Sequence, residues 1–176
     1  EATSQNKNYL SIFLAWIGNQ VGVTYGDDAS SAYTSDLVEV FDMYDVNCTY
    51  LNSFDANLAI NNIKSRVPVI IKGRRTVGST TTGHAWVADG YRRTDARTTY
   101  YYYTSPLELS PWQIASLTIE DSNYSRSTTT VNKYFHMNWG WDGDYDAYYL
   151  VSSDSWSPKE TPYNIDIGMI YGFTKQ

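Results

Sequence analysis

The chain has a single cysteine among its 176 residues, so it cannot form an internal disulfide bond. It has no excess of basic residues either, because 13 lysines and arginines stand against 19 acidic residues, for a net charge of -6. Such a charge gives no positive surface for nucleic acid or an anionic membrane. No apolar run approaches the roughly 18 residues that span a bilayer. We therefore expect a soluble protein with neither nucleic acid nor a membrane as its partner.

The first residues, Glu1-Ala2-Thr3-Ser4, contain neither an initiator methionine nor the apolar stretch of a signal peptide. This start is typical of a processed piece, and we expect the natural N-terminus to lie upstream. A length of 176 residues with 42% hydrophobic content suits one globular domain, residues 1–176, with a substantial core. The 17 tyrosines and 6 tryptophans favour β-sheet, where aromatic side chains are common.

Apolar spacing predicts three helices in the first third of the chain, at residues 9–19, 36–44 and 56–63. Asp36 and Glu39 resemble a capping box at the start of the second helix, and Asp55 precedes the third at its positive end. After Pro68 the pattern changes to short runs rich in β-formers, which predict strands at residues 67–72, 84–89, 99–104, 131–139, 147–152 and 165–173. This order indicates an α+β fold, mainly helical over residues 1–66 and mainly antiparallel sheet over residues 67–176. Residues 92–132, dominated by Ser, Thr and Tyr, look like an inserted excursion.

The segment GHAWVADGY, residues 83–91, presents a histidine on a predicted strand. Alternation along that strand places His84, Trp86 and Ala88 on one face. Taken alone, His84 is more typical of a surface or structural residue than of a catalytic one. A cysteine peptidase, however, needs an imidazole beside its thiol and a second group that fixes the ring.

The segment YFHMNWGWDGDYDAYY, residues 134–149, offers that second group. Alternation places His136 and Asn138 on one strand face and Trp139 on the other. The Asn138 amide could accept a hydrogen bond from a ring nitrogen of His84, while Trp139 and Trp141 could shield that contact and line a cleft. Without the segment at residues 83–91, ordinary packing in the core or at a sheet edge would explain Trp139 and Trp141 equally well. We expect His136 to be a polar core or edge residue.

Together the two segments resemble the streptopain family of papain-like cysteine peptidases. The resemblance implies a papain-like fold in which N-terminal helices precede a twisted antiparallel β-sheet. It implies that His84 is the general base and Asn138 its orienting residue, with Trp139 and Trp141 lining the cleft. The small-residue loop Ser30, Ser31 and Ala32 resembles the family's loop beside the substrate cleft. A protein or peptide substrate and secretion from a bacterium are also implied, without a metal ion or other cofactor.

The family's nucleophilic cysteine lies at the head of a helix that precedes everything matched here. Cys48, the one thiol, lies after the second predicted helix near the start of a strand, so we expect a structural role for it. We therefore expect an N-terminal chain or upstream segment to supply the nucleophile, and the isolated chain to aggregate, dimerise or hold a partner.

Two alternatives to this interpretation remain, and a third motif is excluded. The first is a peptidase-like binding or inhibitory module without catalytic activity, which the missing nucleophile favours. The second is a carbohydrate-binding domain, suggested by the tyrosine and tryptophan content alone. The third is a calcium loop at residues 142–146 (DGDYD), but Ala147 and Ser153 stand where an EF-hand requires Gly and Glu. We expect an exposed turn there.

Overall fold

The computed structural model describes residues 4–27, 30–102, 111–112, 124–151 and 156–176, and of the side chains in the first helix those of Tyr9 and of residues 11–20. It divides into two compact units. One combines Glu1–Arg92 with Tyr134–Gln176, and the other is Arg93–Lys133. The second unit covers nearly the same residues as the excursion at 92–132. The organisation of the chain as a single domain stays a prediction.

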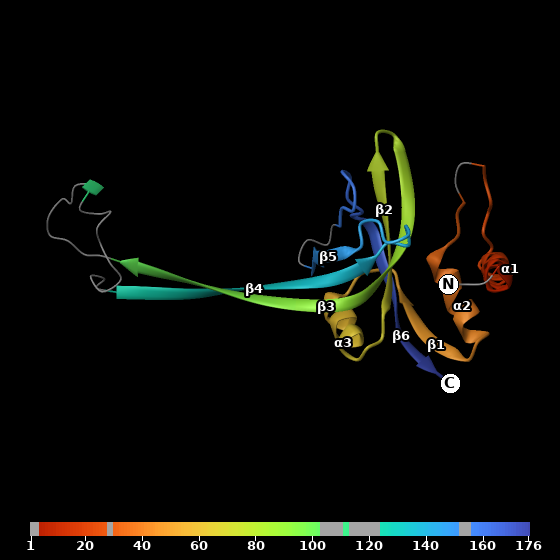
Figure 1. Ribbon diagram of the computed structural model, residues 1–176, viewed down its shortest axis with the longest axis horizontal. Helices are drawn as coiled ribbons and strands as arrows, with labels where there is room; N and C mark the ends of the chain where they lie inside the picture. The colour runs from red at the N-terminus through yellow and green to blue at the C-terminus, as the bar shows by residue number, and fades with distance from the viewer. Residues whose placement is uncertain (1–3, 28–29, 103–110, 113–123, 152–155) are drawn as a thin grey trace. The chain divides into compact units, whose positions relative to one another are not determined.

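The strands form one six-stranded sheet in the order β1-β6-β2-β3-β4-β5 (Figure 1). Each pairing whose register is described is antiparallel. Together with the three α-helices in the described part of the chain, this sheet confirms the α+β class. The strand bounds are Val46–Leu51 for β1, Val69–Val77 for β2, Thr80–Tyr102 for β3, Tyr124–Asn138 for β4, Ala147–Leu150 for β5 and Ile165–Lys175 for β6.

The helices are α1 (Ser4–Gln20), the 3-10 turn η1 (Thr34–Asp36), α2 (Leu37–Asp42) and α3 (Ala56–Lys64), in the three places where the sequence predicts them. Asp55 caps α3, because its carboxylate accepts hydrogen bonds from the backbone N–H groups of Asn57 and Leu58. The capping box predicted at Asp36 is wrong. The Asp36 side chain makes no cap and instead accepts a hydrogen bond from the Ser35 hydroxyl, since η1 leads directly into α2.

The prediction for β3 also needs correction. The runs at residues 84–89 and 99–104 are predicted as separate strands, but β3 is continuous from Thr80 to Tyr102, so His84 lies inside the strand and does not open it. β1 contains Cys48, so the strand expected at that residue is present within the mainly helical region. Its partner is β6, the last strand of the chain.

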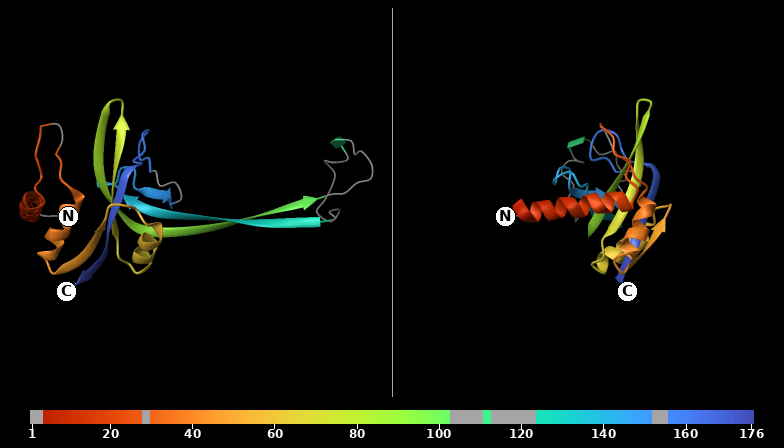
Figure 2. Two further views of the ribbon diagram at one scale, coloured as in Figure 1. Left: turned by 180° about the vertical axis from the view of Figure 1, so that it is seen from behind. Right: turned by 90° about the vertical axis from the view of Figure 1, so that its right-hand side faces the viewer.

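The core of the first unit lies where α3 packs against the sheet. Side chains alternate between the two faces of a strand, so Phe135 and Met137 of β4 are fully buried next to the partly exposed Tyr134 and His136. Figures 1 and 2 show α3 alongside the sheet, close to β2 and β3. The remaining buried side chains of this core are Ala59, Ile60, Ile63, Val69, Ile71, Trp86, Ala88, Trp139, Val151, Trp156, Tyr163 and Met169.

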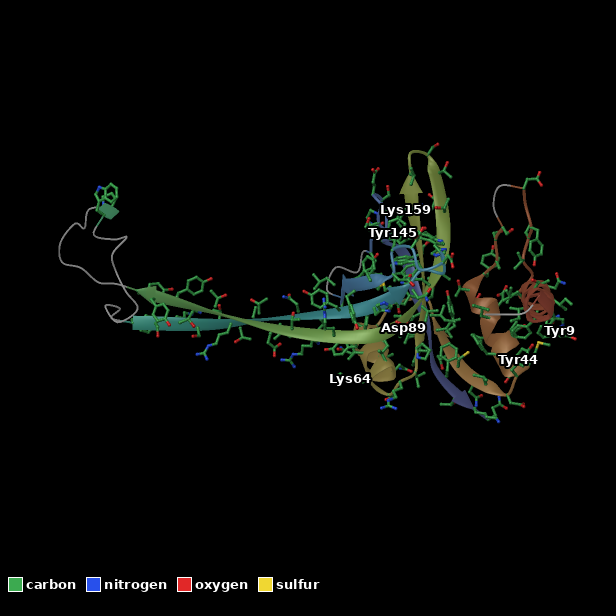
Figure 3. The ribbon with its side chains drawn as sticks, in the orientation of Figure 1. Tyr9, Tyr44, Lys64, Asp89, Tyr145 and Lys159 are labelled. Atoms are coloured by element: carbon green, nitrogen blue, oxygen red, sulfur yellow. The ribbon has the colours of Figure 1, made fainter. Side chains whose placement is uncertain are left out.

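Helix α1 contributes little to this core. Among its described side chains, Phe13 and Trp16 contact the ring of Tyr44 just after α2, where Figure 3 shows Tyr44 near the helix. The side chains of Ile12, Phe13, Leu14 and Trp16 remain 67%, 43%, 56% and 36% exposed. No helix in the described part of the chain is long and apolar enough to cross a membrane.

The second unit contains the distal parts of β3 and β4. Its described side chains are largely exposed, and polar contacts join the strands, with Ser127 bonded to both Arg97 and Thr99. The rings of Tyr102 and Tyr124 lie against each other with centroids 5.6 Å apart. A two-stranded ribbon of this kind is marginally stable by itself in water.

Candidate active site

His84 lies in β3 opposite Gly73 of β2, on the sheet face that carries the buried Trp86 and Ala88. The predicted common face of these three residues of β3 is confirmed. Four aromatic rings surround the imidazole, with centroid distances of 4.8 Å to Trp141, 5.8 Å to Tyr163, 6.1 Å to Trp139 and 6.3 Å to Trp86. The histidine is therefore half-buried in an aromatic cluster at one end of the core.

One hydrogen bond fixes the imidazole. The His84 Nε2 atom lies 2.9 Å from the backbone carbonyl oxygen of Trp139. A carbonyl oxygen can only accept, so Nε2 must carry the proton, and in the neutral ring Nδ1 is then the unprotonated nitrogen. The contact thus selects the tautomer whose Nδ1 can take a proton from an acidic group.

Asn138 does not make this contact through its side chain. Its carboxamide oxygen accepts a hydrogen bond from the backbone N–H of Gly140 at 2.9 Å. The reason is strand alternation: Phe135, Met137 and Trp139 face the core, whereas Asn138 is exposed on the other face. The residue predicted to orient His84 is therefore one position away from the atom that contacts the ring.

The surroundings of His84 lower its pKa below the ordinary histidine value. Burial is the main cause, because the cluster disfavours the charged ring, and the Arg75 guanidinium acts in the same direction. The hydrogen bond to the Trp139 carbonyl opposes both effects. His84 is thus neutral and able to accept a proton over a wider range of pH than a free histidine.

Trp139 and Trp141 both stack on the imidazole, but they differ in exposure. Trp139 is fully buried and stacks on Trp86 with centroids 4.6 Å apart. Trp141 is partly exposed, and the Lys159 ammonium lies 4.8 Å from its ring centroid. Lys159 and Tyr145 lie close together in Figure 3, and Tyr145 meets the Trp141 ring edge-on.

A pocket of about 760 Å³ lies beside His84, between the 30–35 loop and strands β2 and β3. Ser30, Ser31 and Ala32 all line it, together with His84. The predicted small-residue loop and His84 therefore line the same pocket, although more than fifty residues separate them in the sequence. Neither Trp139 nor Trp141 is among the residues that line this pocket. The substrate-binding role of all five residues stays a prediction.

Cys48 lies in β1 and is remote from His84. In the sheet order, β6 and β2 separate β1 from β3, a distance of roughly 14 Å at the usual strand spacing. Burial, followed by the negative charge of Asp42, raises the pKa of the Cys48 thiol, which disfavours the thiolate. These observations agree with a structural role for this cysteine.

His136 belongs to the opposite face of the sheet. Its Nδ1 atom lies 2.6 Å from a carboxylate oxygen of Asp89, and both side chains are partly exposed. Gly90 makes room for it, because a Cβ there would lie 2.7 Å from the His136 Cβ. His136 is expected to be a polar core or edge residue; it is polar and partly exposed, and its strand β4 lies between β3 and β5, so it is neither in the core nor on a sheet edge.

Two residues at the site have no signal in the sequence pattern. The Asp146 carboxylate accepts a hydrogen bond from the Trp139 backbone N–H at 2.9 Å, although its DGDYD segment suggested only an exposed turn. Arg75 stacks on the Tyr163 ring at 4.9 Å, and its buried Nε has no hydrogen-bond partner in the described part of the chain. Among the described residues, no three His, Cys, Asp or Glu side chains are grouped so that they could hold a metal ion.

Residues 1–149 match the model of the peptidase C10 family, the streptopain family. The chain belongs to this family. The resemblance drawn from the two sequence segments is thereby confirmed. A comparison with curated protein sequences found no match.

Among solved structures, the chain is similar to "active wild-type Prevotella intermedia interpain A cysteine protease". The TM-score is 0.63 at 18% sequence identity, and the alignment covers 98% of this C10 family chain and 60% of the interpain A chain. At this identity the likeness shows the fold, which is papain-like, as expected. The chain spans about three-fifths of the length of the solved protein.

Proposed function

We propose that this chain is the base-bearing part of a cysteine endopeptidase, with the nucleophilic cysteine supplied by another segment or a partner chain. The observation that carries the proposal is the state of His84: half-buried among tryptophans, held through Nε2 by the Trp139 carbonyl, with Nδ1 unprotonated. Membership of the peptidase C10 family supports the same reaction class.

In the assembled enzyme, Nδ1 of His84 would accept the proton of the incoming thiol and leave a thiolate. The thiolate would attack the carbonyl carbon of the scissile peptide bond, and the imidazolium would then protonate the departing amine. Water, deprotonated by the same nitrogen, would hydrolyse the resulting thioester. The depressed pKa of His84 suits the first step at near-neutral pH, because the ring begins uncharged.

The substrate would be a protein or peptide that lies across His84. We assign its binding to the loop of Ser30, Ser31 and Ala32 on one side and to Trp141 on the other, with Trp139 behind the imidazole. Secretion from a bacterium is part of the proposal, since it follows from the family resemblance.

The alternative is a peptidase-like module that binds or inhibits without cutting. It is favoured by the position of Cys48, which lies too far from His84 to serve as its nucleophile. The carbohydrate-binding alternative is weaker. Rings that stack on sugars must be exposed, whereas Trp86 and Trp139 beside His84 are at most 2% exposed; the most exposed rings, Trp112 at 86% and Tyr33 at 80%, do not belong to the aromatic cluster around His84.

Mass spectrometry of the purified protein, native and then denatured, tests the proposal. We expect a second polypeptide with a cysteine that iodoacetamide alkylates readily at mildly acidic pH. His84→Ala should abolish both this alkylation and the hydrolysis of a fluorescently labelled protein, whereas His136→Ala, on the opposite face, should leave both intact. A lone 20.1 kDa species that binds peptides without cleaving them would support the binding module instead.

A further inference from the structure

The peptide group between Trp139 and Gly140 links two hydrogen bonds at the site. Its carbonyl oxygen accepts from His84 Nε2 at 2.9 Å, and its N–H donates to the Asn138 carboxamide oxygen at 2.9 Å. Hydrogen bonds on the two ends of one amide strengthen each other, because each polarises the group for the other. Asn138 therefore acts on His84 through a peptide group, although the two side chains do not meet.

The neighbouring peptide group is held as well. The N–H of Trp139 donates to the Asp146 carboxylate at 2.9 Å, and hydrogen bonds to a charged acceptor are among the stronger ones in proteins. Trp139 thus has its N–H fixed by Asp146 and its carbonyl directed at His84. Asn138 ends β4 just before the loop that carries Trp141, and Asp146 lies at the far end of that loop.

The loop between Trp139 and Asp146 is held in an unusual backbone conformation. Gly140 and Gly143 have φ of 74° and 89°, and the non-glycine residues Asp142 and Tyr145 have φ of 57° and 66°. The left-handed conformation costs glycine little, but at Asp142 and Tyr145 it costs free energy and persists only where the surroundings enforce it. Two backbone hydrogen bonds hold this loop: the Asp144 N–H donates to the Trp141 carbonyl, and the Asp146 N–H donates to the Gly143 carbonyl. The Tyr149 hydroxyl also donates to the Tyr145 carbonyl at 2.7 Å.

We propose that Asp146, together with Asn138, is a positioning residue that holds the Trp139 carbonyl on His84 Nε2 and so fixes the orientation of the imidazole. Neither residue touches the reacting atoms. The proposal rests on the proposed function in taking His84 as the base, but the hydrogen bonds it concerns belong to this chain alone. They can be measured without a nucleophile or a substrate.

The test uses NMR of the ¹⁵N-labelled chain, in which His84 and His136 are the two histidines. We expect an Nε2–H resonance of His84 that is protected from solvent exchange in the wild type and lost in Asp146→Ala. The His84 pKa should fall further in this variant, because the bond to the Trp139 carbonyl raises it. A substitution that only loosened the aromatic cluster would instead raise the His84 pKa, because burial in the cluster lowers it.

Matched variants separate the hydrogen bond from the charge. Asp146→Asn keeps an acceptor oxygen without the charge and should retain the protected resonance. Asp144→Ala removes a carboxylate from the same loop, and it should leave His84 unchanged because the Asp144 contact to Trp141 is made by the backbone. The signals of His136, bonded to Asp89 on the other face, should stay constant throughout. Arg75, the other charged group that acts on His84, is present in every variant.

Asn138→Ala tests the second half of the proposal and serves if Asp146→Ala fails to fold. It should weaken the Nε2–H protection and lower the His84 pKa in the same direction. In an assembled active enzyme, both alanine variants should reduce kcat with little change in KM. Unchanged Nε2–H protection and pKa in a folded alanine variant would overturn the proposal, whether or not the chain is part of a peptidase.

Discussion

Substitution of Leu14 tests whether α1 needs a partner. Ile12, Phe13, Leu14, Ala15, Trp16 and Ile17 are six consecutive apolar residues, and at 100° per residue they surround the helix. A helix that is apolar on all sides is typical of a buried helix, yet Leu14 is 56% exposed here. We therefore expect the purified chain to self-associate or to hold a second polypeptide through α1.

The size of the effect follows from the exposed fraction. Full burial of a leucine side chain is worth about 1.5–3 kcal/mol, so the exposed part of Leu14 still offers about 1 kcal/mol or somewhat more. Leu14→Glu removes this gain and adds the cost of burying a charge. We expect the dissociation constant to rise at least tenfold for a complex with a partner chain, and about a hundredfold for a symmetric dimer, in which the substitution counts twice.

Sedimentation velocity over a range of protein concentrations measures this association. The matched control is Val77→Glu, because Val77 is 54% exposed at the end of β2 and the substitution adds the same charge. It should leave the association unchanged. A wild-type chain that sediments as a stable monomer at all concentrations, or equal effects of the two substitutions, would refute the reasoning.

Two further predictions concern the surroundings of His84. Gly73→Ala should destabilise the fold by about 1–3 kcal/mol in urea unfolding, because the new Cβ would lie 2.5 Å from the Ile167 Cδ1 and 3.1 Å from Trp86. The control is Gly83→Ala, which should change stability little because no atom lies nearer than 3.8 Å to its new Cβ. Equal losses of stability in the two variants would contradict the prediction. Arg75→Gln should raise the His84 pKa, followed by NMR titration, since it removes a positive charge that disfavours the imidazolium. The control is Arg74→Gln, which should leave the His84 pKa unchanged because Arg74 pairs with Asp166. A lower His84 pKa in Arg75→Gln would contradict the prediction.

The fold class could be predicted from the sequence because its signals are local. The apolar spacing of α3 and the Asp55 cap that begins it need only a few neighbouring residues, and the same holds for the run of β-branched residues in β2. The strand at Cys48 could be expected from the sequence, but its pairing with β6, more than a hundred residues further along the chain, could not. The single long strand β3 was also missed, since exposed Thr and Tyr residues after position 92 give no alternation of buried and exposed positions.

The sequence by itself determined the family and named the histidine. The motif around His84 and the Asn-Trp-Gly-Trp run are contiguous stretches whose chemistry can be recognised without coordinates. Only the tertiary structure decided which atom holds the imidazole. Strand alternation turns the Asn138 side chain to the opposite face, so the ring contacts the Trp139 carbonyl, and Asp146 fixes the backbone that carries it. Backbone groups are present at every residue and leave no trace in the sequence, so their roles emerge only when the chain is folded.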